Sequence, residues 1–399
     1  MTSARCRTFF VAVFFLLINS FPLAFVCSTT NPKMMTSLKA TASSTVRTVA
    51  VIGGTHGNEY TGVFCIKALE RKLKNGGDQH YPFRISTLIG NPVAFEQNKR
   101  FVDEDLNRQF SAATMAAATA AYTDPAFLSV EQKRAKELDQ LLGPKFGNED
   151  QPPATDFIID LHTTTSNMHT ALIVGQGDPL TTQAAAYVMH KCQEKNFKVC
   201  IMMHTHKTGE VRPNLSSIAP HAFTIEVGPV PQGVLRHDKV EEMQETLNSA
   251  LEFLQRNQQE PEKLLNELKT FYPSGKIPCY RSAPAIREGE MSAKLVWPSD
   301  PDNENFPQWL VHKDVQDQDF QEIKKGDPLF VNLDGDVIPY DGSHGSPVLL
   351  MFINEGGYYY ASSGTGISVA LKDEFDLITG NLIPKELPTL QCSSTTPLE

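Results

Sequence analysis

The feature that most constrains the fold is an alternation of strand-like and helix-like patterns between residues 47 and 256 of this 399-residue chain. Short, β-branched apolar runs alternate with longer segments whose apolar residues recur at helical spacing. The strand patterns cover residues 47–52, 84–90, 156–161, 170–174, 198–203 and 222–227. The helix patterns cover residues 61–73, 130–142, 180–194 and 238–256. Such alternation predicts an α/β domain with a largely parallel sheet, whose functional sites lie beyond the carboxyl ends of the strands.

The composition changes over residues 257–276, a polar stretch that precedes a region rich in Gly, Pro and Asp turns. Short apolar runs in that region, such as 328–331 and 348–352, predict a smaller β-rich domain. We therefore expect three parts after the N-terminal segment: an α/β domain over 46–257, a β-rich domain over 258–386 and a disordered tail over 387–399.

The first 45 residues have the composition of a targeting segment. Arg5 and Arg7 precede the apolar run 9–18, which has the length of a signal-peptide core, and small residues follow it. A signal anchor that stays attached is the alternative. Residues 28–45 contain nine Ser or Thr and no acid, which is typical of a transit peptide or of a disordered linker. We expect entry into the secretory pathway, leading to secretion, the ER lumen or, if 28–45 is a transit peptide, a plastid.

The charge of the remaining chain argues against an anionic partner. The full chain carries a net charge of −10, and removal of residues 1–45, which hold four basic residues and no acid, leaves −14. We therefore expect no nucleic acid partner and no membrane embedding of the mature part. Five cysteines remain after residue 45 without paired spacing, so no disulfide framework is predicted.

The turn after the first predicted strand, within residues 51–62, carries Gly53, Gly54 and Gly57 together with His56 and Glu59. A phosphate-binding loop would need Gly-Lys-Ser/Thr at its end, whereas this loop ends in Gly-Asn-Glu, whose carboxylate would repel a phosphate. His56 and Glu59 are three residues apart and project to the same side of a first helical turn. An imidazole and a carboxylate suit zinc, although a solvated first helical turn is the simpler alternative for this pair alone.

A third candidate ligand lies at the end of the apolar strand 157–159, which continues into Asp160-Leu161-His162. The carboxyl end of this strand should direct His162 toward the crevice of His56 and Glu59, which favours a metal over a histidine that merely caps the strand. Asp160 is then predicted to accept the second ring N–H of a ligating histidine.

Another apolar strand ends in Glu226, and an acid at such a position is costly unless it is paired or functional. Beside a metal-activated water, Glu226 is a candidate general base, and a structural salt bridge is the alternative. The segment 98–108 contains Arg100 and Arg108 among acidic residues. Such mixed charges are commonly a solvated face, but Arg also binds carboxylates through two parallel hydrogen bonds.

Five motifs together resemble the aspartoacylase and aminoacylase-3 family, which is related to the zinc carboxypeptidases. They are GGTHGNE (53–59), RFVDEDLNR (100–108), DLHTTTSNM (160–168), IEVGPVPQGVLR (225–236) and NEGGYYY (354–360). The resemblance spans residues 47–372. It implies a zinc-carboxypeptidase-like, mostly parallel sheet flanked by helices, a smaller β-rich domain that narrows the active-site channel, one Zn²⁺ per subunit and a possible homodimer.

The resemblance also implies a role for individual residues. The zinc ligands match His56, Glu59 and His162. The general base matches Glu226, and the group that helps to polarise the scissile carbonyl matches Arg100. The groups that hold the substrate carboxylate match Asn107, Arg108 and Tyr358.

This chain departs from the family pattern where aspartoacylases bind a side-chain carboxylate. Ser216 and Ala361 stand at positions that carry Arg and Lys in those enzymes, and Thr163 replaces an Asn that is usual in animal members. Arg212 is near enough in sequence to take over the missing charge. From sequence alone we expect weak activity on N-acetylaspartate and better activity on substrates with neutral side chains.

We therefore expect a zinc-dependent amidohydrolase that deacylates N-acyl-L-amino acids to a carboxylate and a free amino acid, with a small-molecule N-acyl-amino acid as its partner. The alternatives are a carboxypeptidase-like peptidase and a non-catalytic ligand-binding relative.

Overall fold

The computed structural model describes most of the chain from Thr45 onward, which forms one compact unit. The described residues are 45–75, 80–119, 128–148, 150–204, 212–283, 285–287, 290–292, 294–295, 309–360 and 366–384. The predicted targeting segment (apart from Thr45), Ala361 and the predicted tail lie outside these ranges. Among the described residues, no helix combines the length and apolarity that a membrane span requires.

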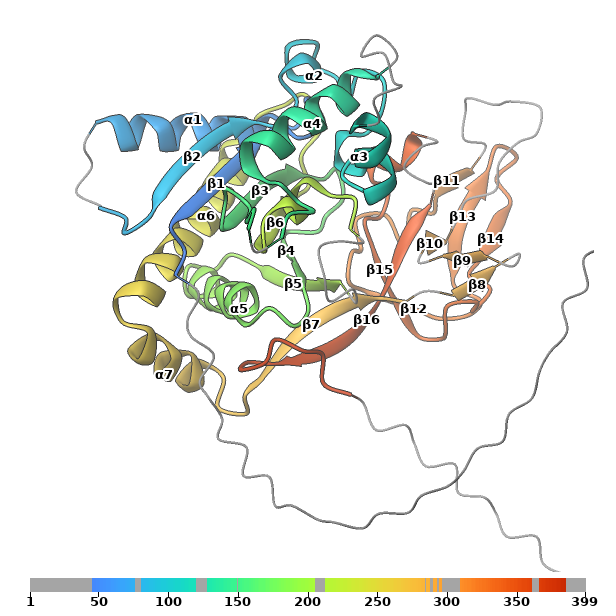
Figure 1. Ribbon diagram of the computed structural model, residues 1–399. Coiled ribbons are helices and arrows are strands. Elements are labelled where there is room, and N and C mark those ends of the chain that lie inside the picture. The colour runs from blue at the N-terminus through green and yellow to red at the C-terminus, as the bar shows by residue number, and fades with distance from the viewer. Residues whose placement is uncertain are drawn as a thin grey trace, which may run out of the picture. The chain divides into compact units, whose positions relative to one another are not determined.

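An eleven-stranded sheet runs through the molecule (Figure 1). Its order is β12-β15-β16-β7-β5-β4-β6-β3-β1-β2, and β10 also pairs with β16. The strands from the predicted α/β domain, which form one half of this sheet, are β1 (Thr48–Gly53), β2 (Arg84–Ile89), β3 (Phe157–Thr163), β4 (Thr170–Gly175), β5 (Val199–His204) and β6 (His221–Val227). These strands pair in parallel except for β4 with β6. The structure thus confirms the predicted mostly parallel sheet.

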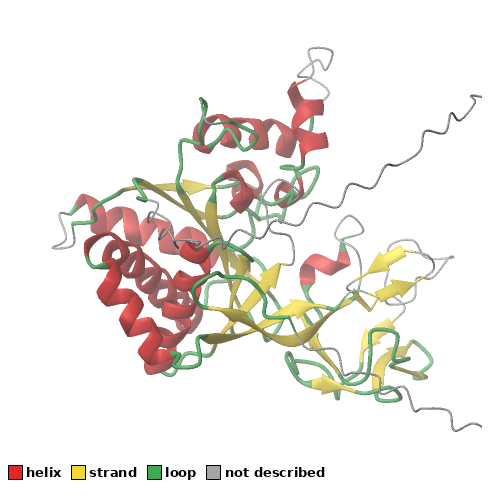
Figure 2. Ribbon diagram, turned by 60° about the horizontal axis from the view of Figure 1, so that its bottom comes forward, coloured by secondary structure: helices red, strands yellow, loops and turns green. Residues whose placement is uncertain are grey.

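Helices cover both faces of this half, because alternate residues of its apolar strands point to opposite sides. Val49 and Val51 of β1 pack into one core, whereas Ala50 and Ile52 pack into another. The helices of the first core, gathered on one side of the strands in Figure 2, are α1 (Tyr60–Lys74), α5 (Pro179–Glu194), α6 (His237–Gln259) and α7 (Pro261–Phe271). The opposite side carries α3 (Ala112–Thr119), α4 (Val130–Leu142) and the short 3₁₀ helices η1 (Leu106–Arg108) and η4 (Leu215–Ile218). A short helix, α2 (Pro92–Glu96), follows β2.

The C-terminal part continues the same sheet before it forms smaller ones. Antiparallel pairing joins β7 (Lys276–Ser282), β16 (Ile367–Asp376), β15 (Val348–Met351), β12 (Glu322–Ile323) and β10 (Lys294–Leu295). Two further sheets contain β11 (Trp309–Val311), β13 (Pro328–Asn332) and β14 (Val337–Pro339), and β8 (Ala285–Arg287) with β9 (Glu290–Ser292). These strands confirm a β-rich C-terminal part with its own core. Because β7 pairs in parallel with β5, this part is joined to the α/β half through continuous hydrogen bonding.

Candidate metal centre and substrate cavity

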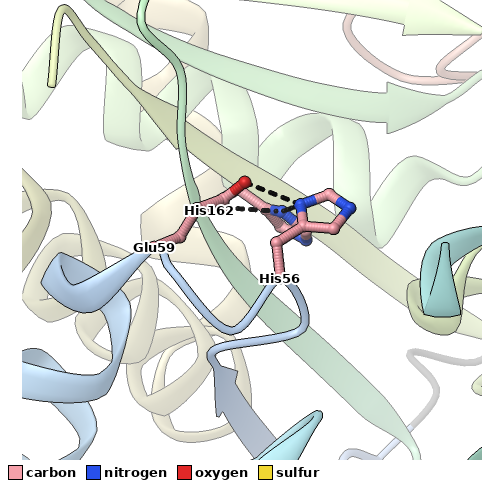
Figure 3. Close-up of side chains that lie close together, drawn as sticks. All are labelled: His56, Glu59 and His162. Atoms are coloured by element: carbon pink, nitrogen blue, oxygen red, sulfur yellow. Dashed lines mark hydrogen bonds and ion pairs between the residues drawn. The ribbon is translucent and has the colours of Figure 1, made fainter. Parts of the chain in front are cut away.

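Three buried side chains converge at the carboxyl ends of β1 and β3. His56 and Glu59 come from the turn between β1 and α1, and His162 is the penultimate residue of β3. The Nδ1 atoms of His56 and His162 lie 3.2 Å apart. The Glu59 carboxylate lies 2.6 Å from Nδ1 of His56 and 3.1 Å from Nδ1 of His162 (Figure 3). Their ligand atoms all lie within 4.8 Å of one another, so the cluster could hold a metal ion.

Close backbone packing orients the turn that carries two of these groups. A Cβ atom on Gly57 would lie 2.2 Å from the backbone carbon of Ala94, so this contact requires glycine. The Gly57 N–H also donates to the carbonyl oxygen of Arg100 over 3.0 Å. The glycine-rich turn is therefore held against the segment that carries Arg100.

Each histidine is held from behind by a buried carboxylate. Nε2 of His162 lies 2.8 Å from Asp160, and the Thr55 hydroxyl donates to the other oxygen of Asp160 over 2.8 Å. Nε2 of His56 lies 3.1 Å from Asp105. These contacts favour a proton on each Nε2 and leave each Nδ1 as the atom that faces the cluster. The sequence predicted Asp160 in this role but missed Asp105.

The carboxylates and histidines of the cluster shift one another's pKa values. Burial alone would raise the pKa of Glu59, but the charges of His56 and His162 outweigh it and lower this pKa. Burial alone would lower the pKa of His162, but Asp160 and Glu59 outweigh it and raise this pKa well above its usual range. Positive charge at the centre of the cluster is therefore favoured by the surrounding carboxylates.

Arg100 borders the cluster and is nearly buried. Its Nη1 donates to Glu59 over 3.2 Å, and its Nη2 lies 3.8 Å from Asp105. Burial would lower the pKa of Arg100, but Glu59 and Asp105 outweigh it, and the guanidinium stays charged. The guanidinium of Arg100 lies against Gly357, and a Cβ atom added to this glycine would lie 2.9 Å from Cζ of Arg100.

A cavity of about 250 Å³ opens over the cluster and brings the other predicted residues together. Besides the three cluster residues, its lining includes Arg100, Asn107, Arg108, Glu226 and Tyr358. Glu226 lies on β6 directly opposite His162 of β3. Burial raises the pKa of Glu226 above its ordinary value, Glu59 and Glu355 add to the shift, and His162 and Arg100 oppose it. All the predicted site residues except Asp160, which lies behind His162, therefore line one cavity.

The C-terminal part supplies one wall of this cavity, including Met351, Phe352 and Glu355. The Glu355 carboxylate accepts hydrogen bonds from the Thr164 hydroxyl, from Thr165 N–H over 2.9 Å and from Gly357 N–H over 2.8 Å. These bonds tie the turn before Tyr358 to the end of β3. Sequence reasoning assigned no role to Glu355, although its position in the motif NEGGYYY was a signal.

Arg212 also lines the cavity, as does Ser216. The Arg212 guanidinium lies over Gly175 at the end of β4. A Cβ atom added to Gly175 would lie 3.7 Å from Cζ of Arg212. The residue's own carbonyl oxygen is held by Lys145 Nζ and by the Ser217 hydroxyl. In the described part of the chain, the buried Nε of Arg212 has no hydrogen-bond partner. Arg212, which is near enough in sequence to take over the missing charge, therefore lines the cavity.

Two models of known protein families match the chain. A family model described as the succinylglutamate desuccinylase/aspartoacylase catalytic domain matches residues 45–254, and one described as the AstE/AspA barrel-sandwich hybrid domain matches residues 290–366. The chain is 34% identical over 312 residues to a Danio rerio N-acyl-aromatic-L-amino acid amidohydrolase (carboxylate-forming), covering 78% of this chain and 85% of that protein.

A second relative and a solved structure extend the comparison. The chain is 36% identical over 317 residues to the aspartoacylase of Xenopus tropicalis, covering 79% of this chain and 89% of that protein. The crystal structure of murine aminoacylase 3 matches with a TM-score of 0.65 and 28% identity, covering 86% of this chain and 99% of that chain. The chain belongs to the succinylglutamate desuccinylase/aspartoacylase family.

Proposed function

We propose that this protein is a zinc-dependent amidohydrolase that converts N-acyl-L-amino acids into a carboxylate and a free amino acid. The observation that carries the proposal is a single cavity in which the His56–Glu59–His162 cluster lies next to Glu226 and two arginines. Relatives named as amidohydrolases of N-acyl-aromatic amino acids and as aspartoacylases support this class of reaction.

The donor set fits zinc. Two imidazole nitrogens and a carboxylate are a common catalytic zinc set, and the carboxylates behind His56 and His162 are the usual partners of ligating histidines. Zinc in such a site acts as a Lewis acid and lowers the pKa of water toward neutrality. His56, Glu59 and His162 would hold the ion.

Glu226 is the proposed general base. It lies in the cavity opposite His162, and burial gives its carboxylate a raised pKa and therefore a greater affinity for a proton. Its carboxylate accepts the proton of the attacking water and then delivers this proton to the departing amine nitrogen. A water supplies the oxygen of the new carboxylate, so the products are one acid and one amine.

Arg100 is the proposed donor to the oxygen that becomes negative as the carbonyl is attacked. Its guanidinium is fixed by Glu59 and Asp105 and keeps its charge in a nearly buried position. Loss of one such donor typically costs about 10²–10³ in rate.

Arg108, Asn107 and Tyr358 are proposed to hold the carboxylate of the amino acid. The Asn107 side-chain oxygen accepts a hydrogen bond from Leu215 N–H over 2.9 Å, which leaves its amide N–H₂ as a donor. Arg108 adds a guanidinium, and Tyr358 adds a hydroxyl that is hydrogen-bonded to the Ser368 hydroxyl over 2.7 Å. These donors would orient the scissile amide toward the metal cluster.

The cavity also bears on which substrates fit. Its volume of about 250 Å³ favours small substrates over the long chains of the peptidase alternative. Arg212 adds a cation to the lining, and among the described residues its buried Nε has no hydrogen-bond partner. A buried charge of this kind is costly unless a counter-charge or a ligand compensates it. We therefore propose, against the expectation from Ser216 and Ala361, that substrates with a second carboxylate are also turned over.

The test is a panel assay with the purified zinc-loaded protein. It compares N-acetyl derivatives of tyrosine, methionine, aspartate and glutamate with a dipeptide and a decapeptide, and it measures the release of primary amine. Turnover of one or more N-acyl-amino acids without cleavage of the decapeptide supports the proposal. Cleavage of the decapeptide supports the peptidase, and zinc binding without any turnover supports the non-catalytic relative.

A further inference from the structure

The segment 97–105 carries two groups of the site but has no regular structure of its own. It connects α2 to η1 and holds Arg100 and Asp105. Helix or strand hydrogen bonds do not fix its path, so other contacts must set the positions of both side chains.

One fully buried carboxylate makes those contacts. Glu131, in the first turn of α4, is 0% exposed. Its Oε1 accepts hydrogen bonds from Val102 N–H over 2.8 Å and from the Asn91 side chain over 2.9 Å. Its Oε2 accepts from Asp103 N–H over 3.0 Å and from Glu104 N–H over 3.1 Å. Four donors, three of them consecutive backbone amides, fill the acceptor capacity of this carboxylate.

The segment also binds the start of α4 in return. Asp103 accepts a hydrogen bond from Val130 N–H over 2.8 Å. Gln132 Nε2 donates to Glu104 over 3.3 Å, and Gln132 also completes a capping box with Ser129. The contacts of Glu131 are therefore the centre of a two-way clamp between the segment and the helix.

The charge of Glu131 is balanced by N–H groups rather than by a cation. None of the ion pairs between described residues includes Glu131. Its position in the first turn of α4 adds the favourable field of the helix N-terminus. A glutamine of equal size would keep one acceptor oxygen but would turn an N–H₂ group toward backbone N–H donors. Glu131→Gln would therefore break half of the clamp with little change in volume.

We propose that Glu131 is a positioning residue that fixes the segment 97–105 and thereby places Arg100 and Asp105 at the metal cluster. The inference rests on the proposed function, because the proposed reaction is what gives Arg100 and Asp105 their catalytic importance. Glu131 is absent from the lining of the cavity, so it acts through the segment and not on the substrate.

Both Arg100 and Asp105 lie within two residues of a backbone amide that Glu131 holds. Arg100 precedes Val102 by two residues, and its carbonyl oxygen is held by Gly57 N–H on the other side. Asp105 follows Glu104 directly and contacts His56. A shift of about 1 Å in groups of this kind can cost about 10²-fold in rate.

The kinetic test compares Glu131→Gln with Glu137→Gln, a matched change at an exposed position of the same helix. We expect kcat/KM for the best panel substrate to fall about 10–100-fold in Glu131→Gln, mainly through kcat, and to stay within about twofold in Glu137→Gln. Each variant should keep one zinc per chain.

A double-mutant cycle separates positioning from general support of the fold. In an Arg100→Ala background, Glu131→Gln should cost several-fold less than in the wild type, because one of the two groups that it places is already gone. An equal cost in both backgrounds would overturn the proposal.

Hydrogen exchange gives a readout that does not depend on activity. Amides of residues 98–108 should lose protection in Glu131→Gln but not in Glu137→Gln, while those of β1 and β3 keep theirs. Uniform loss of protection across the protein, or no loss at all, would overturn the proposal that Glu131 holds the segment.

If Glu131→Gln does not fold, Asp103→Asn is the second variant, because it weakens the hydrogen bond that the exposed Asp103 accepts from Val130 N–H in the same clamp. If the wild type hydrolyses nothing on the panel, the proposed function fails, and exchange still decides whether Glu131 holds the segment.

Discussion

The Nδ1 atoms of His56 and His162 face each other at 3.2 Å, with the Glu59 carboxylate in contact with both. Two imidazole nitrogens at this separation require a shared cation or proton between them and the carboxylate. Since Asp105 and Asp160 hold the outer ring nitrogens, the inner ones are directed to a single point.

We first predict one zinc per chain, measured by elemental analysis of purified protein. His162→Ala should lose most of the metal and all measurable turnover, because it removes one of three ligands. The control is His237→Ala, an exposed histidine at the start of α6. Full zinc content in His162→Ala would show that the metal binds elsewhere.

The second prediction concerns Asp105, whose carboxylate contacts both His56 and Arg100. Asp105→Asn should weaken zinc binding about 10–100-fold, the usual cost of losing a partner behind a ligating histidine. Competition with a chromogenic chelator measures the affinity, and Asp238→Asn at an exposed position is the control. Unchanged zinc affinity and turnover would mean that Asp105 only supports the fold.

The sequence predicted the residues whose positions follow from strand ends. In a parallel sheet, the carboxyl ends of β1, β3 and β6 meet at one edge, so His56, His162 and Glu226 could be placed together before their distances were known. The alternating patterns likewise located all six strands of the first half.

Contacts made by irregular segments could not be predicted in the same way. Asp105 lies 49 residues from His56, in a segment without periodicity, and its role depends on the path of the backbone there. The pairing of β7 with β5 was missed for a related reason. A polar stretch precedes β7, and composition does not show which strand β7 pairs with.

A third prediction concerns Arg212. Arg212→Ala should lower kcat/KM for N-acetylaspartate at least about tenfold more than for N-acetyltyrosine, because only the former offers a second carboxylate to the guanidinium. Arg212→Lys should recover part of the loss. An N-succinyl amino acid with a neutral side chain tests whether the acyl group can supply that carboxylate instead. Equal effects on all substrates would show that Arg212 does not select for charge.

The most direct test of the account is the turnover of Glu226→Gln, since Glu226 is the one group assigned to move the proton. We predict a loss of about 10²–10⁴ in kcat with zinc content unchanged. Glu241→Gln, an exposed change on α6, should behave like the wild type. A Glu226→Gln protein that releases free amino acid at a near-normal rate would contradict the account.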